Sequence, residues 1–531
     1  MSDNVLSASS STSGVSNVRR FPWKILLVCA VVLLPVLTYP FGQDHSTFIR
    51  GGRVLLAGGT LYVDYVDVKP PLIYVIFGLA DFVAGSSVVL VRALEVVFQL
   101  ITIGALLFVL NGITQRRLWL WISAIAYAVL YCNQGYSQVG QAESFCALPI
   151  VGALWCATQT GGRSRWLVLA LCMTVAVMLK YTLGIIGPAV CIVWLFRNGL
   201  RNSFPTIVAT AAAFIGLMLI CYTPFLLSDG FLDGLKATMQ YLGVYSAYPA
   251  FGPILVRNAL KLTAIWFGDN LSITTTFLVV VAVALLLAKR YSLREQGVVS
   301  SSVWMFLALI LTVILERKFA PYHFSRLNIP ISFLVGTTAL YWTEVRERFL
   351  SSSREIRWGF AFVICLLLVL SPLPRYMNVV QLGIRSIGNP SVYDAYLTRP
   401  ELPGFDFNAI RVLRTDLNNR LVPSDRLLMM SMMATPLLTQ LPTIQTSSFA
   451  DSHMYFGTGA TSSWRERAAT DLRRANWVVV DTIDVCEGVN LHQRTSWQSL
   501  KADTLLLPIL TTHFTAVDTV ACFIIYKRVQ S

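Results

Sequence analysis

The chain has 531 residues, of which 55% are hydrophobic and only 13% are charged. A soluble domain ordinarily carries about 25% charged residues, so this composition excludes a conventional cytosolic enzyme. The 42 Lys and Arg residues exceed the 28 Asp and Glu residues, but basic residues in a membrane protein first serve to anchor cytoplasmic loops. We therefore expect a polytopic α-helical membrane protein and no nucleic-acid partner.

Residues 1–20 are predicted to form a disordered cytoplasmic tail, because a segment rich in Ser, Thr, Asn and Gly buries too little apolar surface to order itself. Arg19, Arg20 and Lys24 then precede an apolar run from Ile25 to Tyr39. This pattern is similar to a secretory signal, but more apolar runs follow and no clear small-residue cleavage site ends it. We interpret it as an uncleaved first span.

About 11 apolar segments are predicted to cross the membrane. They cover about residues 25–39, 88–112, 118–132, 143–160, 165–180, 182–197, 205–227, 271–288, 299–315, 328–343 and 358–374. Lys and Arg concentrate in alternate loops, at residues 116–117, 163–165, 197–201, 289–294 and 346–357. A topology with the N-terminus inside places all of these loops in the cytoplasm. It makes residues 21–374 a transmembrane domain and leaves residues 375–531 outside the cytoplasm.

The first outer loop, residues 40–87, contains an apolar segment that is too short for a comfortable span. This segment, Pro71 to Ala84, begins with a double proline, so we expect a helix at the membrane interface. The C-terminal region is predicted to be a small α/β domain. Its expected strands are Arg426 to Met433, Trp477 to Asp481 and Ala521 to Tyr526, its expected helix is Thr461 to Ala475, and Cys486 and Cys522 can pair if it faces an oxidising compartment.

Ionisable residues collect in the predicted outer loops, where a charge near the membrane is costly unless it has a function or a partner. The candidates are Asp44, Asp64, Asp67, Lys69, Glu143, Lys180, Lys318, Tyr322, His323 and Arg326. A carboxylate can take a proton from an attacking hydroxyl, while cations can neutralise a phosphate leaving group. Neither GxxxxGK[ST] nor GxGxxG after a strand occurs, which argues against a nucleotide-sugar donor. The pattern favours group transfer from a lipid-bound phosphate.

The first outer loop combines Asp44, a Gly58-Gly59 turn and the motif Leu61-Tyr-x-Asp64-x-x-Asp67-x-Lys69-Pro-Pro, and later loops contain Lys180-Tyr-Thr and Lys318-Phe-Ala-Pro-Tyr322-His323. With these residues the chain resembles the GT-C superfamily of membrane glycosyltransferases. The bacterial branch with protein O-mannosyltransferases, aminoarabinose transferases and lipopolysaccharide-core glycosyltransferases is the most similar. The resemblance implies an inverting transferase of the bacterial cytoplasmic (inner) membrane. It would move a hexose or pentose from a polyprenyl-phosphate donor to a hydroxyl of a glycan, lipid or protein acceptor on the outer face.

The resemblance also implies roles for individual residues. Asp44 matches the catalytic base, Lys69 the cation near the donor phosphate, and Glu143 a second acidic position. Lys180, His323 and Arg326 would approach the phosphate or the sugar, and Asp64, Asp67, Lys318 and Tyr322 would contact substrate. The sequence departs from the pattern at His45, where many relatives carry another acidic residue. No acidic pair is dense enough to demand a metal, so no cofactor is expected, and a divalent metal stays an alternative that the sequence does not support.

Structural explanations compete with each of these roles. Asp44 can be a helix N-cap, Asp64 and Asp67 turn or capping residues, and Lys69 a lysine that reaches to the interface. Glu143 and Lys180 can form a purely structural bridge, Lys318 and Arg326 can be ordinary loop cations, and His323 an interfacial histidine. His453, His492 and His513 show no metal-ligand spacing and are predicted to be surface or core residues.

The alternative function is a secondary transporter or lipid flippase. A transporter should have an internal repeat and polar groups on both sides of the bilayer, whereas the sequence has no detectable repeat and places its ionisable residues at one face. A non-catalytic sensor or assembly protein is a third and weaker possibility.

Overall fold

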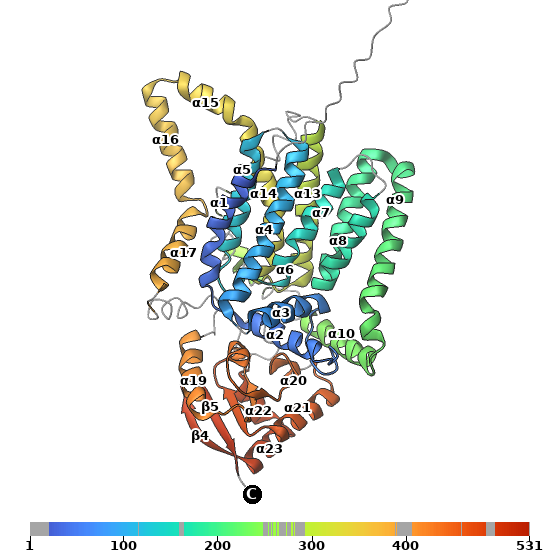
Figure 1. Cartoon of the computed structure of the whole chain (residues 1–531), viewed down its shortest axis with the longest axis vertical. Helices are drawn as coiled ribbons and strands as arrows, with labels where there is room; N and C mark the ends of the chain where they lie inside the picture. The colour runs from blue at the N-terminus through green and yellow to red at the C-terminus, as the bar shows by residue number, and fades with distance from the viewer. Residues whose placement is uncertain are drawn as a thin grey trace, which may run out of the picture.

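The computed structural model shows a mostly helical protein with a small sheet near the C-terminus (Figure 1). It describes residues 21–247 except 86, 115 and 159–163, scattered positions between 253 and 281, residues 293–387 and 389, residues 406–484 except 458, and residues 494–529. The predicted disordered tail, residues 1–20, and Cys486 of the possible disulfide lie outside the described residues.

Three of the described helices are long and apolar enough to cross a membrane, namely Val88–Ile113, Tyr181–Leu226 and Glu295–Glu316. Two bent pairs also qualify if each is one span: Trp23–Thr38 with Gln43–Leu56, bent by 89°, and Arg354–Val369 with Leu373–Ser386, bent by 53°. Shorter apolar helices cover Pro71–Ala84, Arg117–Cys132, Ala142–Thr158 and Arg165–Leu179. The chain is therefore a polytopic membrane protein by the length and composition of its helices, and the count of 11 spans stays a prediction.

A bundle of apolar helices forms the larger part of the molecule (Figure 1). Its helices are α1 (Trp23–Leu33), η1 (Leu34–Thr38), α4 (Val88–Ile113), α5 (Arg117–Cys132), α6 (Ala142–Phe145), α7 (Ala147–Thr158), α8 (Arg165–Leu179), η2 (Tyr181–Ile185), α9 (Ile186–Leu226), α10 (Phe231–Ala247), α13 (Leu293–Glu316), η3 (Pro321–Leu327), α14 (Asn328–Gly336), η4 (Thr337–Tyr341), α15 (Trp342–Ser351), α16 (Arg354–Val369) and α17 (Leu373–Ser386). Within α9, Gly199 adopts a φ of 76° and breaks the helix. The two predicted spans at 182–197 and 205–227 correspond to its two halves.

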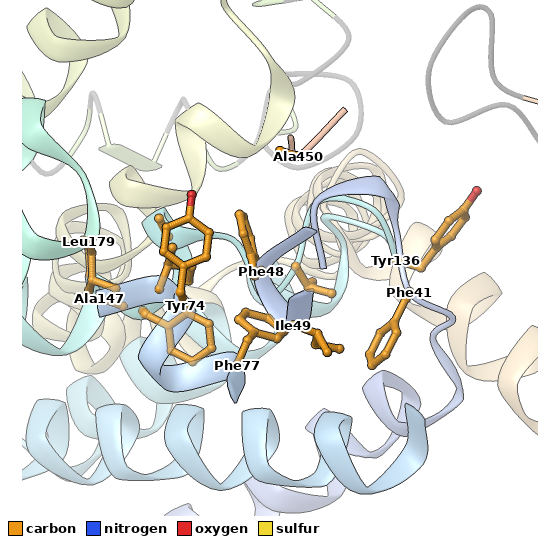
Figure 2. Packing of buried hydrophobic residues seen from close by; sticks show 14 of the residues in the cluster. Phe41, Phe48, Ile49, Tyr74, Phe77, Tyr136, Ala147, Leu179 and Ala450 are labelled. Carbon is orange, nitrogen blue, oxygen red and sulfur yellow. The ribbon is translucent and has the colours of Figure 1, made fainter. Parts of the chain in front are cut away.

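Two helices of the first loop, α2 (Gln43–Leu56) and α3 (Pro71–Ala84), lie between the bundle and the C-terminal domain (Figure 1). They cross where Gly52 faces Gly78, since a Cβ built on Gly52 would lie 2.4 Å from the Gly78 Cα. Only glycine allows two backbones to approach this closely. Figure 2 shows aromatic side chains of both helices packed around the crossing, among them Phe48 of α2 and Phe77 of α3, with ring centroids 5.3 Å apart. This packing fixes both ends of the loop that joins the helices.

The C-terminal domain contains a mixed sheet of order β2-β1-β3-β5-β4. The strands are β1 (Arg426–Met430), β2 (Ile444–Gln445), β3 (Trp477–Asp481), β4 (Phe514–Val520) and β5 (Phe523–Arg528). Strands β2, β1 and β3 are parallel, whereas β5 is antiparallel to both β3 and β4. The helices are α19 (Phe407–Arg420), η5 (Thr435–Thr439), α20 (His453–Phe456), α21 (Ser462–Arg474), α22 (Ser496–Ala502) and α23 (Leu506–His513).

Three of the five strands and one helix lie close to the segments predicted from the sequence. β3 is buried along its whole length, which explains its continuous apolar run. The sequence analysis missed β2, which has only two residues, and β4, an edge strand whose residues are mostly exposed. An exposed edge strand lacks the apolar alternation that marks a half-buried one.

The C-terminal domain is docked on α2 by hydrogen bonds that span almost 400 positions in the sequence. The Thr435 hydroxyl donates to the Gln43 carbonyl at 3.1 Å, and the Arg50 guanidinium donates to the carbonyls of Ser447 at 2.6 Å and Phe449 at 3.2 Å. Arg50 is buried, so these bonds are shielded from water. The helix that carries Asp44 is therefore held from both sides, by the bundle and by this domain.

Candidate functional site

A cavity of about 310 Å³ lies where the bundle, the first loop and the C-terminal domain meet. Its charged and titratable lining residues are Asp44, Asp67, Lys69, Glu143, Lys180, Tyr181, Tyr241, Tyr245, Glu316, Lys318, Tyr322, His323, Asp451 and His453. Gln43, Thr47, Ser137, Gln138, Gln141, Thr182 and Ser246 add neutral polar groups. Such a concave site with many convergent polar groups fits a hydrophilic substrate.

Asp44 stands in the first turn of α2, but it is not the residue that caps this helix. Gly42 holds the N-cap position, and its backbone N–H donates to the Nδ1 atom of His45 at 2.9 Å. The N-cap explanation for Asp44 is therefore wrong. Its side chain is 26% exposed and remains available to the cavity.

His45 is fully buried and does not line the cavity. With Nδ1 accepting from Gly42, the proton lies on Nε2, which donates to the Val139 carbonyl at 2.7 Å. The residue following Asp44 thus anchors the helix start instead of contacting substrate.

Lys69 contacts Asp44 at the edge of the cavity. Its Nζ atom lies 3.1 Å from Asp44 Oδ2 and 4.4 Å from the centre of the Phe48 ring. Burial acts to lower the pKa of Lys69, but the carboxylates of Asp44, Asp67 and Glu143 outweigh it and raise that pKa. Lys69 therefore stays a cation. Its ammonium contacts the Asp44 carboxylate. A lysine that only reached to the membrane interface would instead extend along an apolar surface toward water.

Asp67 lines the cavity two residues before Lys69 and accepts a hydrogen bond from the backbone N–H of Val68 at 2.6 Å. Burial raises the pKa of Asp67 to about 6, and the opposing effect of Lys69 is smaller. Its carboxyl group therefore changes charge near neutral pH. This makes the net charge around Lys69 dependent on pH.

A second ionic cluster comprises Glu143, Lys180, Glu316, His323 and Arg326. Lys180 pairs with Glu143 and lies 2.8 Å from Glu316, while Arg326 donates to Glu143 at 3.0 Å and to Glu316 at 2.8 Å. Nδ1 of His323 lies 3.2 Å from Glu316. These side chains come from α6, the start of η2, the end of α13 and η3, so the cluster ties four segments together.

The cluster is close to electrically balanced, because two carboxylates face the two cations Lys180 and Arg326. Burial lowers the pKa of His323 to about 3, so its ring is neutral. One ligand atom each from Glu143, Glu316 and His323 lie within 4.8 Å of one another, a spacing that suits a metal ion. Lys180 and Arg326, however, occupy oxygens of the same carboxylates, so a divalent cation would have to compete with both.

Two of the predicted cavity residues, Lys318 and Tyr322, lie outside this ionic cluster. Lys318 lies with its Nζ atom 3.9 Å from the centre of the Tyr245 ring, which is a cation–π contact. The backbone N–H of Tyr322 donates to the side chain of Gln138 at 3.0 Å, which fixes the turn that carries Tyr322 and His323. Both residues line the cavity.

The structure brings eight of the ten predicted site residues together around the cavity, and the other two lie elsewhere. Asp64 is on an exposed turn, where its Oδ2 atom accepts a hydrogen bond from Thr60 at 2.8 Å, as the turn explanation expects. Arg326 is fully buried behind Glu143 and Glu316 and does not line the cavity. It is placed to support those carboxylates, not to touch a phosphate.

Among the acidic and histidine residues of the cavity, sequence reasoning missed Glu316, Asp451 and His453. Glu316 adjoins the quoted motif of the loop before η3 but was not selected, although a glutamate at the end of an apolar helix is itself a signal. Asp451 and His453 line the cavity from the C-terminal domain. No local pattern marks them, because their position depends on long-range docking.

The apolar helices and the charged cavity at one end of the bundle define a membrane protein with a polar site. No protein-family model and no curated protein matches the sequence. The chain is similar to arabinofuranosyltransferase AftD from Mycobacteria, at 13% identity and a TM-score of 0.47, over 97% of this chain but only 40% of that one. It is also similar to the oligosaccharyltransferase of Archaeoglobus fulgidus in complex with Zn and sulfate, at 11% identity and a TM-score of 0.44, over 86% of this chain and 68% of that one.

Both of these proteins transfer glycosyl groups, as their names state, and this chain spans less than half the length of AftD. Because both TM-scores are below 0.5, the two likenesses assign neither a family nor an activity to this chain.

Proposed function

We propose that the chain is a GT-C-type membrane glycosyltransferase that moves a hexose or pentose from a polyprenyl-phosphate donor to an acceptor hydroxyl. We place the reaction at the outer face of the bacterial cytoplasmic membrane. The observation that carries the proposal is the contact between Asp44 and Lys69, 25 positions apart, at 3.1 Å in a cavity bordered by apolar helices. These are the two residues that the first-loop motif assigns to base and phosphate cation.

In the proposed reaction the acceptor oxygen attacks the anomeric carbon from the face opposite the phosphate. Asp44 accepts the hydroxyl proton as the new carbon–oxygen bond forms. The bond from the anomeric carbon to the phosphate oxygen breaks, and polyprenyl phosphate leaves with the electron pair. The configuration at the anomeric carbon inverts.

The contact between Asp44 and Lys69 has a consequence for this step. A donor phosphate that takes the Lys69 ammonium as its partner removes that cation from Asp44 Oδ2, and this oxygen is then free to take a proton. Donor binding would thereby prepare the base. Lys180 and Lys318 line the same cavity and add positive charge near the departing phosphate.

The test is to purify the full chain, reconstitute it in lipid and supply a panel of undecaprenyl-phosphate hexoses and pentoses. The acceptor is envelope material extracted from cells that lack the gene. We expect release of undecaprenyl phosphate together with a new glycoside detected by mass spectrometry. Movement of the donor across the bilayer without any glycosidic product would instead support the flippase alternative and refute the proposal.

A further inference from the structure

One wall of the cavity comes from the C-terminal domain and not from the membrane helices. Five residues of this domain line the same cavity as Asp44: Met432, Ala450, Asp451, His453 and Met454. Asp451 and His453 are the two that carry titratable groups. The ionic pairs described above do not include either of them.

Backbone contacts hold this wall in place. Val66 of the first loop and Phe449 form an isolated parallel bridge, in which the Val66 N–H donates to Ser448 at 2.8 Å and the Ala450 N–H donates to Val66 at 3.0 Å. The Tyr241 hydroxyl of α10 donates to the His453 carbonyl at 3.4 Å. Asp451 is therefore fixed beside the loop segment that leads to Asp67 and Lys69.

Asp451 and His453 form a pair with spare hydrogen-bonding capacity. Oδ1 of Asp451 accepts from the His453 backbone N–H at 2.8 Å and lies 3.5 Å from His453 Nδ1. The two side chains are 24% and 16% exposed, so both reach the cavity. A carboxylate beside an imidazole offers acceptors and a donor, which suits hydroxyl groups that both donate and accept.

The pair and the buried cluster reach the cavity from different parts of the molecule. Figure 1 shows α6, which carries Glu143, on the bundle side and α20, which begins at His453, on the side of the C-terminal domain. An inverting displacement needs the incoming hydroxyl and the leaving phosphate on opposite faces of the sugar. With the phosphate near Lys180 and Lys69, the acceptor approaches from the C-terminal domain.

We propose that Asp451 and His453 bind hydroxyl groups of a carbohydrate acceptor, so that the C-terminal domain forms the acceptor side of the cavity. The inference rests on the glycosyltransferase activity proposed above. It assigns acceptor specificity to the docked domain and donor binding to the membrane helices and the first loop.

The test compares two reactions of the full-length protein with the undecaprenyl-phosphate sugar that it turns over fastest. One is hydrolysis of this donor, in which water replaces the acceptor, and the other is transfer to the envelope extract from cells lacking the gene. We expect Asp451→Asn and His453→Gln to raise the acceptor concentration for half-maximal transfer at least fivefold. The donor KM and the rate of hydrolysis should stay at the wild-type values.

Asp451→Asn keeps an Oδ1 acceptor for the His453 N–H, so its thermal unfolding should match that of the wild type. Asp518→Asn is the matched control, because Asp518 lies on the exposed strand β4 of the same domain and pairs with Arg420. Hydrolysis that falls as much as transfer, or an unchanged acceptor requirement, would overturn the inference while leaving the transferase proposal intact. A wild-type protein that released no undecaprenyl phosphate in either reaction would instead refute the transferase proposal and the inference with it.

Discussion

The two ionic groups around the cavity differ in how strongly they are held. Asp44 and Lys69 form a single contact and are 26% and 22% exposed, whereas Glu143 and Arg326 of the second group are 2% and 0% exposed and share several bonds. An exposed pair is weakly coupled and can exchange partners, while a buried and balanced cluster resists change. In the proposed reaction the first group carries the chemistry, and the second group supports the cavity, apart from Lys180, which also faces the donor phosphate.

The largest expected effect is on turnover, from Asp44→Asn. The amide cannot accept the proton, so kcat should fall by about a thousandfold, within the usual range for loss of a general base. Thermal unfolding should change little, because Asp44 neither caps α2 nor lies in the core. Release of undecaprenyl phosphate measures the rate.

The matched control for this variant is Asp233→Asn, which makes the same charge change at an exposed position in the first turn of α10. We expect wild-type turnover from it. Full activity of Asp44→Asn would rule out Asp44 as the base. It would also contradict the proposal that the pair of Asp44 and Lys69 carries the chemistry.

The next effect is on stability, from Arg326→Gln in the buried cluster. Removal of the guanidinium leaves Glu143 and Glu316 with Lys180 as their remaining cation, and breaking a buried ion pair costs about 3–5 kcal/mol. We expect a large drop in the midpoint of thermal unfolding in detergent. Arg420→Gln, which breaks the partly exposed pairs with Asp416 and Asp518, should cost at most about 1 kcal/mol.

Equal stability of the two arginine variants would show that the cluster is not structural. The cluster would then have to be counted among the groups that act on substrate, and not among those that support the cavity.

The smallest expected effect concerns pH and Asp67. Its pKa is raised to about 6, so the group is mostly neutral at pH 5 and mostly ionised at pH 8. Ionisation adds a negative charge near Lys69, which weakens phosphate binding by roughly 1 kcal/mol, or about fivefold in the donor KM. The donor is a phosphodiester and does not titrate in this range. The donor KM should therefore rise between pH 5 and pH 8 in the wild type.

Asp67→Asn should keep the lower donor KM across this range, because its side chain stays neutral. Because the pKa of Asp67 is raised in the folded state, the folded protein holds a proton between about pH 4 and pH 6 that the unfolded chain has lost. The contribution of Asp67 to the free energy of unfolding therefore falls as the pH rises through this range. Identical pH profiles of donor KM in variant and wild type would show that Asp67 does not influence Lys69.

The parts of the site that sequence reasoning found are those encoded locally. Asp44, Lys69 and the prolines after Lys69 occur within one loop, and the helices on either side have ordinary amphipathic or apolar patterns. Lys180 and His323 were found because a charge next to an apolar span is unusual. In the fold, β3 and α21 were also predicted from local signals, a continuous apolar run for β3 and an amphipathic helical pattern for α21.

The parts that sequence reasoning missed depend on contacts between distant segments. Asp451 reaches the cavity only because Phe449 pairs with Val66, a contact that no local pattern encodes. Arg326 was predicted to touch substrate, but its position behind two glutamates follows from how η3 packs against α13 and α6. The edge strand β4 is mostly exposed, so its sequence does not show the apolar pattern of a buried strand.

The glycine crossing between α2 and α3 gives two positions remote from the chemistry an influence over it. A methyl group at Gly52 would meet the Gly78 backbone and the Tyr74 carbonyl at about 2.5 Å, and relief requires the helix axes to move apart. Asp44 lies on α2 and would move with it, and Lys69 lies just before the start of α3. We therefore expect substitutions of Gly52 and Gly78 to be harmful, although neither residue has a side chain that could take part in the reaction.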